Sequence, residues 1–168
     1  MNREDYVLKR NGEKEIISFD KILRRVKKLS QDKNLGNTEL NVKYTMLVQK
    51  IIDRLFNEIK TREIDELTAQ QCASLSTIEP DYGVLASRIM ISNHHKNTNE
   101  DYSKVVEMLY NFKDIHDNHS PIVSERFNYI VQENKKELNE MIDYNRDYLI
   151  DYFGFKTLER AYLMRING

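Results

Sequence analysis

Five basic residues and a threonine–aspartate pair are the side chains whose types and spacing could do chemistry. The cations are Lys9, Arg10, Lys14, Lys21 and Lys96. Lysine ammonium groups neutralise phosphates as point charges, whereas a guanidinium can bind two oxygens at once. Thr61 and Asp65 are four residues apart, so on a helix they share one face and could hydrogen-bond a sugar hydroxyl. From spacing alone, the more ordinary explanation is a set of solvated hairpin residues and a helix cap.

A predicted hairpin positions the first three of these cations. Residues 6–22 read YVLKRNGEKEIISFDKI, with apolar positions in two short runs on either side of Asn11-Gly12. Asn-Gly is a strong hairpin signal, because both residues tolerate the positive φ of a type I′ turn. A helix is expected to follow at once, capped by Asp20. A hairpin rim that carries Lys9 and Arg10 next to a helix N-terminus is a suitable anion site.

Helices are predicted for the rest of the first half. A turn at 36–38 precedes a helix over 38–58, whose apolar residues follow the helical period. Thr61 is the expected cap of a third helix, and Pro80 separates it from a fourth helix over 81–97. Residues 1–96 are therefore predicted to be a small α+β unit, a short hairpin covered by about four helices.

The second half, 97–168, is predicted to be wholly helical, so the fold class is mostly α. An irregular piece at 113–121 precedes a helix capped by Ser124. The last stretch is dense in aromatic residues: Tyr144, Tyr148, Tyr152, Phe153, Phe155 and Tyr162. We expect this cluster to pack against protein beyond the chain and to be an exposed apolar patch without it. Because Asn167-Gly168 normally opens a turn, we also expect the chain to be cut off there.

Composition favours a soluble globular protein with a small anionic ligand. The 168 residues are 40% hydrophobic and 32% charged, and 26 basic against 27 acidic residues leave a net charge of −1. This balance argues against a nucleic acid or a membrane recognised through bulk charge. Residues 1–36, however, hold ten Lys and Arg against six Asp and Glu. A phosphate fits that local excess better than a polymer does.

Cysteine and histidine usage indicates neither a disulfide framework nor a metal site. The single Cys72 excludes an internal disulfide and a four-cysteine zinc site, and we expect it to be buried. His116 and His119 have a spacing that suits one helix face, but their segment is predicted to be a loop. The charged N-terminus and the absence of a long apolar run predict a cytoplasmic protein.

Two sets of motifs resemble a known family. The run VLKRNGEKEIISFDKI, followed by TREID at 61–65 and by PDY and LASRI between 80 and 89, resembles the ATP-cone at the N-terminus of the ribonucleotide reductase large subunit. The run DYNRD at 143–147 and YFGFKTLERAYLMRING after it resemble the class I large-subunit segment that leads to the catalytic barrel. The resemblance implies residues 1–96 as the ATP-cone and 97–168 as the start of the helical region, with the barrel absent.

The family resemblance implies an effector site rather than a catalytic one. ATP sustains reduction in the family and dATP stops it, through changes in subunit assembly. The matching positions for ATP or dATP, with Mg²⁺, are Lys9, Arg10, Glu15, Ile16, Ile17, Ser18, Phe19, Asp20, Lys21, Thr61, Asp65 and Lys96. No residue matches a catalytic cysteine of the family, so this chain alone should not reduce a substrate.

The same resemblance implies a role for each part of this site. Lys9 and Arg10 match the basic pair that helps to hold the nucleotide, and Lys21 and Lys96 match phosphate contacts. Residues 15–21 match the wall around the base. Asp20 is implied to contact the adenine, and Thr61 and Asp65 to lie on the ribose side. Asn11 stands where the family usually has Asp, which keeps the same turn chemistry.

The family also implies partners, and two rivals stay open. The implied partners are the rest of the large subunit, indirectly the small subunit, and further copies in a homo-oligomer. One rival is a repressor-type ATP-cone protein that binds DNA, but that type normally carries a four-cysteine zinc ribbon. The other is a degenerate docking module that no longer binds nucleotide.

Overall fold

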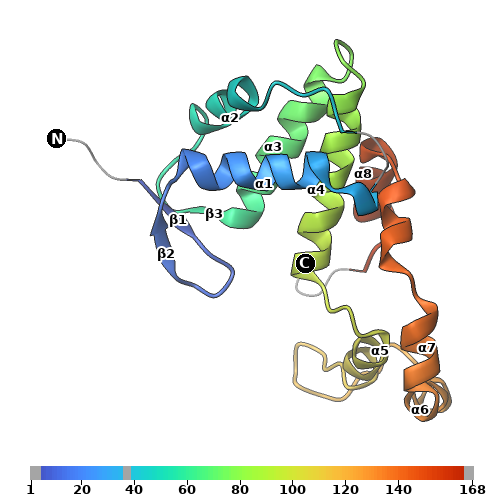
Figure 1. The fold of residues 1–168 in the computed structure, drawn as a ribbon. Helices are drawn as coiled ribbons and strands as arrows, with labels where there is room; N and C mark the ends of the chain where they lie inside the picture. The colour runs from blue at the N-terminus through green and yellow to red at the C-terminus, as the bar shows by residue number, and fades with distance from the viewer. Residues whose placement is uncertain (1–4, 36–38, 165–168) are drawn as a thin grey trace. The chain divides into compact units, whose positions relative to one another are not determined.

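The computed structural model describes residues 5–35 and 39–164, which form two compact units (Figure 1). Residues up to 94 and from 145 onward make up the first unit, and residues 95–144 make up the second. The predicted mostly α fold is confirmed. The predicted domain division at 96/97 remains a prediction, and the first compact unit also includes the last segment of the chain.

The predicted hairpin is present, with a different turn. Strand β1 (Tyr6–Leu8) pairs antiparallel with β2 (Lys14–Ile16), and Tyr6 lies opposite Ile16. The Gly12 amide donates to the Lys9 carbonyl at 3.0 Å, and Gly12 alone in this turn has a positive φ, of 85°. The expectation of a type I′ turn is therefore wrong. The loop is long enough for an ordinary turn closed by a left-handed glycine, which makes a positive φ at Asn11 unnecessary.

A third strand, β3 (Ile59–Lys60), was not predicted. It pairs in parallel with β1 on the side away from β2, giving the order β2-β1-β3. Glu58 precedes it with a φ of 65°, and its amide donates to the Tyr6 carbonyl at 2.7 Å. The three strands lie together beside the start of α1 (Figure 1).

Helix α1 (Phe19–Gln31) follows β2 after two residues. Its N-cap is Ser18, whose hydroxyl accepts from the Lys21 amide, so the expectation of an Asp20 cap is wrong. Asp20 lies two positions after the cap and instead places its charge in the first turn. The last carbonyls of the helix are satisfied by Arg88, which is 3% exposed and donates to Leu29 and Ser30 at 3.0 Å.

The predicted helix over 38–58 is much shorter in the structure, where α2 spans Tyr44–Ile52. Position 38 lies outside the described residues, as does the predicted turn at 36–38. Asn41 and Lys43 donate their amides to Asp81 and to the Tyr82 hydroxyl, so the segment before α2 is held by tertiary bonds rather than helical ones. Beyond Ile52, the chain turns into β3.

Helices α3 (Thr61–Leu75) and α4 (Asp81–Asn97) agree closely with prediction. Lys60 rather than Thr61 is the residue before the first helical turn, and its amide donates to Glu63 at 3.2 Å. Thr61 is therefore free of a capping role. The two helices supply much of the core, in residues Ile64, Ala69, Cys72, Leu75, Tyr82, Leu85, Ala86, Ile89, Met90 and Ile91.

The aromatic segment near the C-terminus packs in part on this same core. It comprises the 3-10 helix η2 (Tyr144–Leu149) and helix α8 (Tyr152–Ala161). Phe155 is buried, and Tyr148 and Tyr152 pack against the core, so the expectation of a wholly exposed cluster is wrong for these three. The prediction holds for Phe153 and Tyr162, which are 68% and 74% exposed. Sequence periodicity shows which face of a helix is apolar but not which distant segment packs on it, so this contact with the first unit's core was not predicted.

The second unit contains α5 (Tyr102–Tyr110), α6 (Glu125–Glu133) and α7 (Lys135–Met141). Val106 and Val131 are its buried centre. Ser124 caps α6 as predicted, accepting from the Phe127 amide at 3.2 Å. The single helix expected after Ser124 is divided at Asn134, whose side chain donates to the Ile130 carbonyl and closes α6.

None of the described helices combines the length and apolar composition needed to cross a membrane.

Candidate functional site

The first part of the candidate site is a pair of lysines on one carboxylate. Lys9 Nζ lies 2.6 Å from Glu15 Oε2, and Lys21 Nζ pairs with the other oxygen of Glu15. Lys9 comes directly after β1, Glu15 lies in β2, and Lys21 is in the first turn of α1. The hairpin and the helix start therefore bring together three residues that are predicted to bind the effector.

The second part is centred on Asp65 in α3, which is 7% exposed. Arg10 reaches it from the hairpin turn, with Nη2 3.8 Å from Asp65 Oδ2. The same guanidinium donates to Thr61 Oγ1 at 3.4 Å and to Asn93 Oδ1. Thr61 and Asp65 share a helix face, as their spacing predicts, and Arg10 joins that face to the hairpin.

Two residues of this network were not predicted. Arg25, in α1, donates to both carboxylate oxygens of Asp65, with Nε 3.3 Å from Oδ1 and Nη2 3.1 Å from Oδ2. Asn93, in α4, is 2% exposed and donates to the Arg62 carbonyl while it accepts from Arg10. A weak sequence signal existed for Arg25, because it lies one helical turn after Lys21.

The other predicted residues have varied surroundings. Ile16 is 50% exposed, Phe19 packs against the core, and Asp20 is exposed in the first turn of α1. Ile17 extends the hairpin through its amide, which donates to the Asp5 carbonyl at 2.9 Å. Ser18 is the α1 cap described above. Lys14 pairs with Glu58.

Lys96 lies in the last turn of α4 and belongs to the second unit, so its place in the site remains a prediction.

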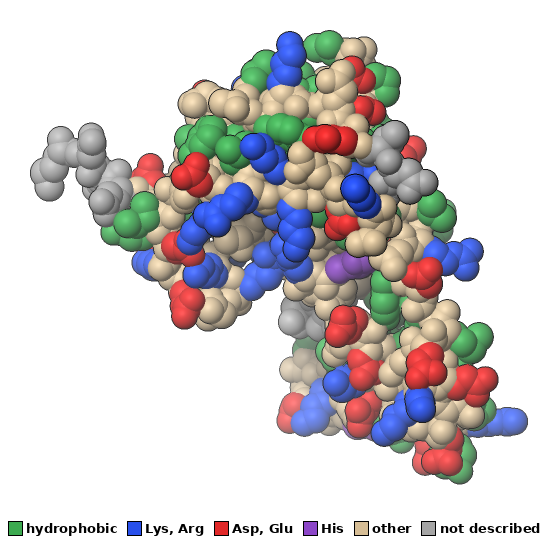
Figure 2. Space-filling view, viewed as in Figure 1, with side chains coloured by type: hydrophobic (Ala, Val, Ile, Leu, Met, Phe, Trp, Pro, Cys, Tyr) green, Lys and Arg blue, Asp and Glu red, His purple; other side chains and the backbone are tan. Residues whose placement is uncertain are grey.

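Positive charge exceeds negative charge in the two parts of the site taken together. Lys9 and Lys21 share the carboxylate of Glu15, and two arginines share that of Asp65. Figure 2 shows Lys and Arg side chains gathered over the face formed by α1 and the hairpin. This arrangement can take up an anion without further positive groups, because the carboxylates only partly neutralise the cations.

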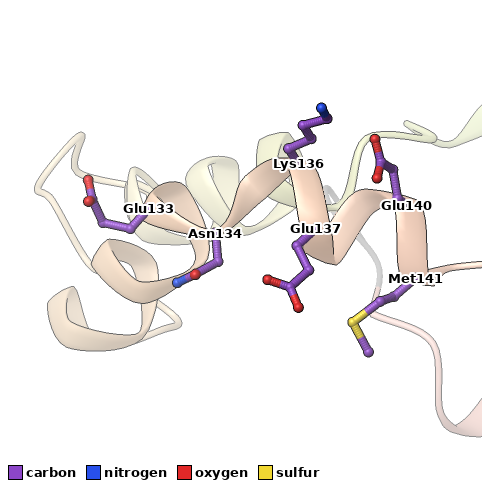
Figure 3. A pocket seen from close by; sticks show the side chains of 6 residues that line it. All are labelled: Glu133, Asn134, Lys136, Glu137, Glu140 and Met141. Atoms are coloured by element: carbon purple, nitrogen blue, oxygen red, sulfur yellow. The ribbon is translucent and has the colours of Figure 1, made fainter.

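The described residues offer little for other chemistry. They contain no cluster of three or more His, Cys, Asp and Glu side chains that could hold a metal ion. A surface depression of about 430 Å³ lies along α6 and α7 (Figure 3) and is lined by Glu133, Asn134, Lys136, Glu137, Glu140 and Met141. Its three glutamates make it unsuitable for a phosphate. Cys72 is fully buried, and this burial raises the pKa of its thiol to about 12.

Comparison with known proteins identifies the domain that contains this site. Residues 5–97 match the ATP cone domain, which is more than half of the chain. The chain belongs to the ATP-cone family. The match includes the hairpin, α1 to α4 and every predicted effector residue, so the charged cluster lies within the ATP-cone.

Relatives of the chain extend the likeness beyond the ATP-cone. It is 47% identical over 163 residues to the ribonucleoside-diphosphate reductase large subunit of Plasmodium falciparum, covering 97% of the chain and 20% of that protein. It is 44% identical over 164 residues to large chain 2 of the same enzyme in Saccharomyces cerevisiae, and 44% identical to the large subunit of Monkeypox virus. Each of these two alignments covers 97% of the chain, and they cover 18% of the yeast protein and 21% of the viral protein. It thus spans about a fifth of the length of the curated relatives it matches and corresponds to their N-terminal regions.

Proposed function

We propose that this chain binds ATP or dATP through its ATP-cone and acts as the overall-activity switch of a ribonucleoside-diphosphate reductase large subunit. Membership of the ATP-cone family and the likeness to large subunits support the proposal. The reaction that it would regulate is the synthesis of deoxyribonucleotides for DNA replication.

The observation that carries this proposal is the junction of Arg10 with Thr61 and Asp65. The junction puts a guanidinium, a hydroxyl and a carboxylate side by side, on elements 51 residues or more apart in the chain. A guanidinium suits a phosphate because it donates hydrogen bonds to the phosphate oxygens. An ionised carboxylate suits sugar hydroxyls because it only accepts hydrogen bonds and the hydroxyls can donate to it. A basic hairpin without a ligand would not need this second set of polar groups, in which Asp65 is buried.

A nucleotide fits the chemistry of these residues. Lys9, Arg10 and Lys21 would hold the phosphates, with Lys96 as a further contact, while Thr61 and Asp65 would hold the sugar. Residues 15–21, with Asp20 among them, would line the base. Mg²⁺ would arrive with the phosphates, because this ion usually keeps several waters and is bound largely through substrate phosphates.

The partners of the chain follow from the same proposal. The effector signal would pass to the rest of the large subunit, which would carry the catalytic residues, and indirectly to the small subunit through assembly. Cys72 is a poor candidate for redox chemistry, since it is buried and its pKa is raised.

Calorimetric titration with ATP tests the proposal. We expect saturable binding to the wild-type chain and weaker binding to Asp65→Asn, which keeps the shape of the side chain but loses its charge. An absence of binding to a folded wild-type chain, or equal affinity in the variant, would contradict this assignment of the site.

A docking module without nucleotide binding is the second candidate function. The large exposed apolar side chains of the last segment favour it, because Leu149, Phe153 and Met164 are 83%, 68% and 63% exposed. Under this alternative, Asp65→Asn would leave association with the rest of a large subunit unchanged, and ATP would not alter it.

A further inference from the structure

We infer that Arg25 is a positioning residue of the effector site, which fixes the Asp65 carboxylate in the orientation needed to accept from the sugar of the nucleotide. This inference rests on the proposed function, since it assigns Asp65 to the sugar. Arg25 itself would not touch the ligand.

The geometry of the pair supports this role. Arg25 approaches Asp65 with two nitrogens on two oxygens, at 3.3 and 3.1 Å, which is the fork geometry that sets both the position and the plane of a carboxylate. The side chains are 23% and 11% exposed, so solvent does little to loosen the contact. By contrast, Arg10 approaches the same carboxylate at 3.8 Å through one nitrogen.

The Arg25 guanidinium is itself held from a third helix. Its Nη2 also donates to Ser92 Oγ in α4 at 3.1 Å. Arg25 therefore connects α1 to both α3 and α4 at the level of Asp65. A guanidinium held by hydrogen bonds to two different helices has little rotamer freedom left to lose when a ligand binds. Preorganisation of a site requires this.

The fork leaves acceptor capacity for a ligand. An ionised carboxylate has about four lone-pair positions, and Arg25 uses two of them. Sugar hydroxyls can donate to those that remain, provided that the carboxylate does not rotate. Loss of Arg25 should therefore weaken the binding of nucleotides that carry sugar hydroxyls. It should hardly affect the binding of a nucleotide that carries none.

The test compares ATP with 2′,3′-dideoxy-ATP on wild type, Arg25→Gln and Arg25→Lys by equilibrium titration. Lys keeps the positive charge beside Asp65 but cannot form the fork. We expect about tenfold weaker ATP binding in both variants, with the affinity for the dideoxy analogue changed less than about twofold. Arg24→Gln is the matched control, because Arg24 is exposed in the same helix and its Nε donates to the Asp20 carbonyl at 3.4 Å. It should change neither affinity beyond about twofold.

A double variant shows whether Arg25 acts through Asp65. If it does, adding Arg25→Gln to Asp65→Asn should produce no further loss of ATP affinity. Equal losses for ATP and the dideoxy analogue, unchanged ATP affinity, or fully additive losses would each overturn the inference. Should Arg25→Gln fail to fold by circular dichroism, Arg25→Lys decides alone. A folded wild-type chain that binds neither nucleotide would overturn the proposed function, and with it this inference.

Discussion

Lys9 and Glu15 form an ion pair across the hairpin, with Lys9 Nζ 2.6 Å from Glu15 Oε2, and Lys21 occupies the other oxygen. The two lysines assigned to the phosphates thus already share a carboxylate. A phosphate that binds to them must compete with Glu15. The carboxylate therefore weakens the attraction for phosphate while it holds the two ammonium groups close together.

Replacing Glu15 by Gln should strengthen the binding of inorganic tripolyphosphate. The variant removes a negative charge beside the lysines at a position that is only partly exposed. We expect about a two- to fivefold gain in affinity, since ion pairs near the surface contribute about 0.5–1 kcal/mol. Titration at fixed, low ionic strength measures it.

Glu13→Gln is the graded control for that experiment. Glu13 Oε2 is 3.6 Å from Lys9 Nζ and its side chain is 66% exposed, so its removal should have a smaller effect. A loss of affinity in Glu15→Gln would show instead that the carboxylate is needed to arrange the lysines.

Lys9→Ala should weaken ATP binding by about 1–3 kcal/mol, the usual range for one charge-assisted contact. Calorimetry on the wild type and the variant gives this difference directly. Lys50→Ala, at an exposed position of α2, provides the comparison and should leave the affinity unchanged. An unchanged affinity in Lys9→Ala would remove Lys9 from the site.

Arg88→Met should destabilise the first unit by about 2–4 kcal/mol. Arg88 donates to the carbonyls of Leu29, Ser30 and Leu35, and its loss leaves the end of α1 without these partners. Urea unfolding followed by circular dichroism measures the change. Arg54→Met is the matched control, because the Arg54 side chain donates an exposed hydrogen bond to Gln71 at 3.4 Å. This substitution should cost less than about 0.5 kcal/mol.

Cys72 should make the protein less stable as the pH rises above about 9. Burial raises the pKa of the folded thiol to about 12, whereas an unfolded cysteine titrates near 8.5. Because the folded pKa is the higher one, the contribution is fully present below about pH 8.5 and is lost progressively towards pH 12. Urea unfolding at pH 7 to 10 should therefore show a shallower decline for Cys72→Ala than for the wild type. Parallel declines would contradict the raised pKa.

Sequence periodicity predicted the parts of the fold that local residues determine. Asn11-Gly12 gave the hairpin, and Pro80 gave the boundary before α4. The short α2 and the strand β3 were missed because their backbone partners lie far away in sequence. Ile59 illustrates this: it follows Leu55 at a helical spacing of four residues, but the structure buries it in a strand beside Val7. Pairing with the distant strand β1 therefore decided between a helix and a strand at this position.

The charged residues of the candidate site could be predicted from the sequence, whereas most of the hydrogen bonds and ion pairs that join them could not. The hairpin lysine Lys9 and the helix residue Lys21 meet at Glu15, all three of them predicted. Asn93 was missed because nothing in its local sequence distinguishes it from a core-facing helix residue. Arg25 was missed because its one signal, a spacing of one helical turn from Lys21, is equally typical of a solvated helix face. Their roles depend on the approach of α1 and α4 to Asp65, which only the folded chain specifies.

A thermal-shift titration of the chain with ATP, dATP and GTP, each with Mg²⁺, measures whether the ATP-cone binds adenine nucleotides. A ligand that binds only the folded state raises stability by RT ln(1 + [L]/Kd). We expect a saturable rise in Tm with ATP and dATP and none with GTP. An unchanged Tm with both adenine nucleotides, in a chain that unfolds cooperatively, would contradict it.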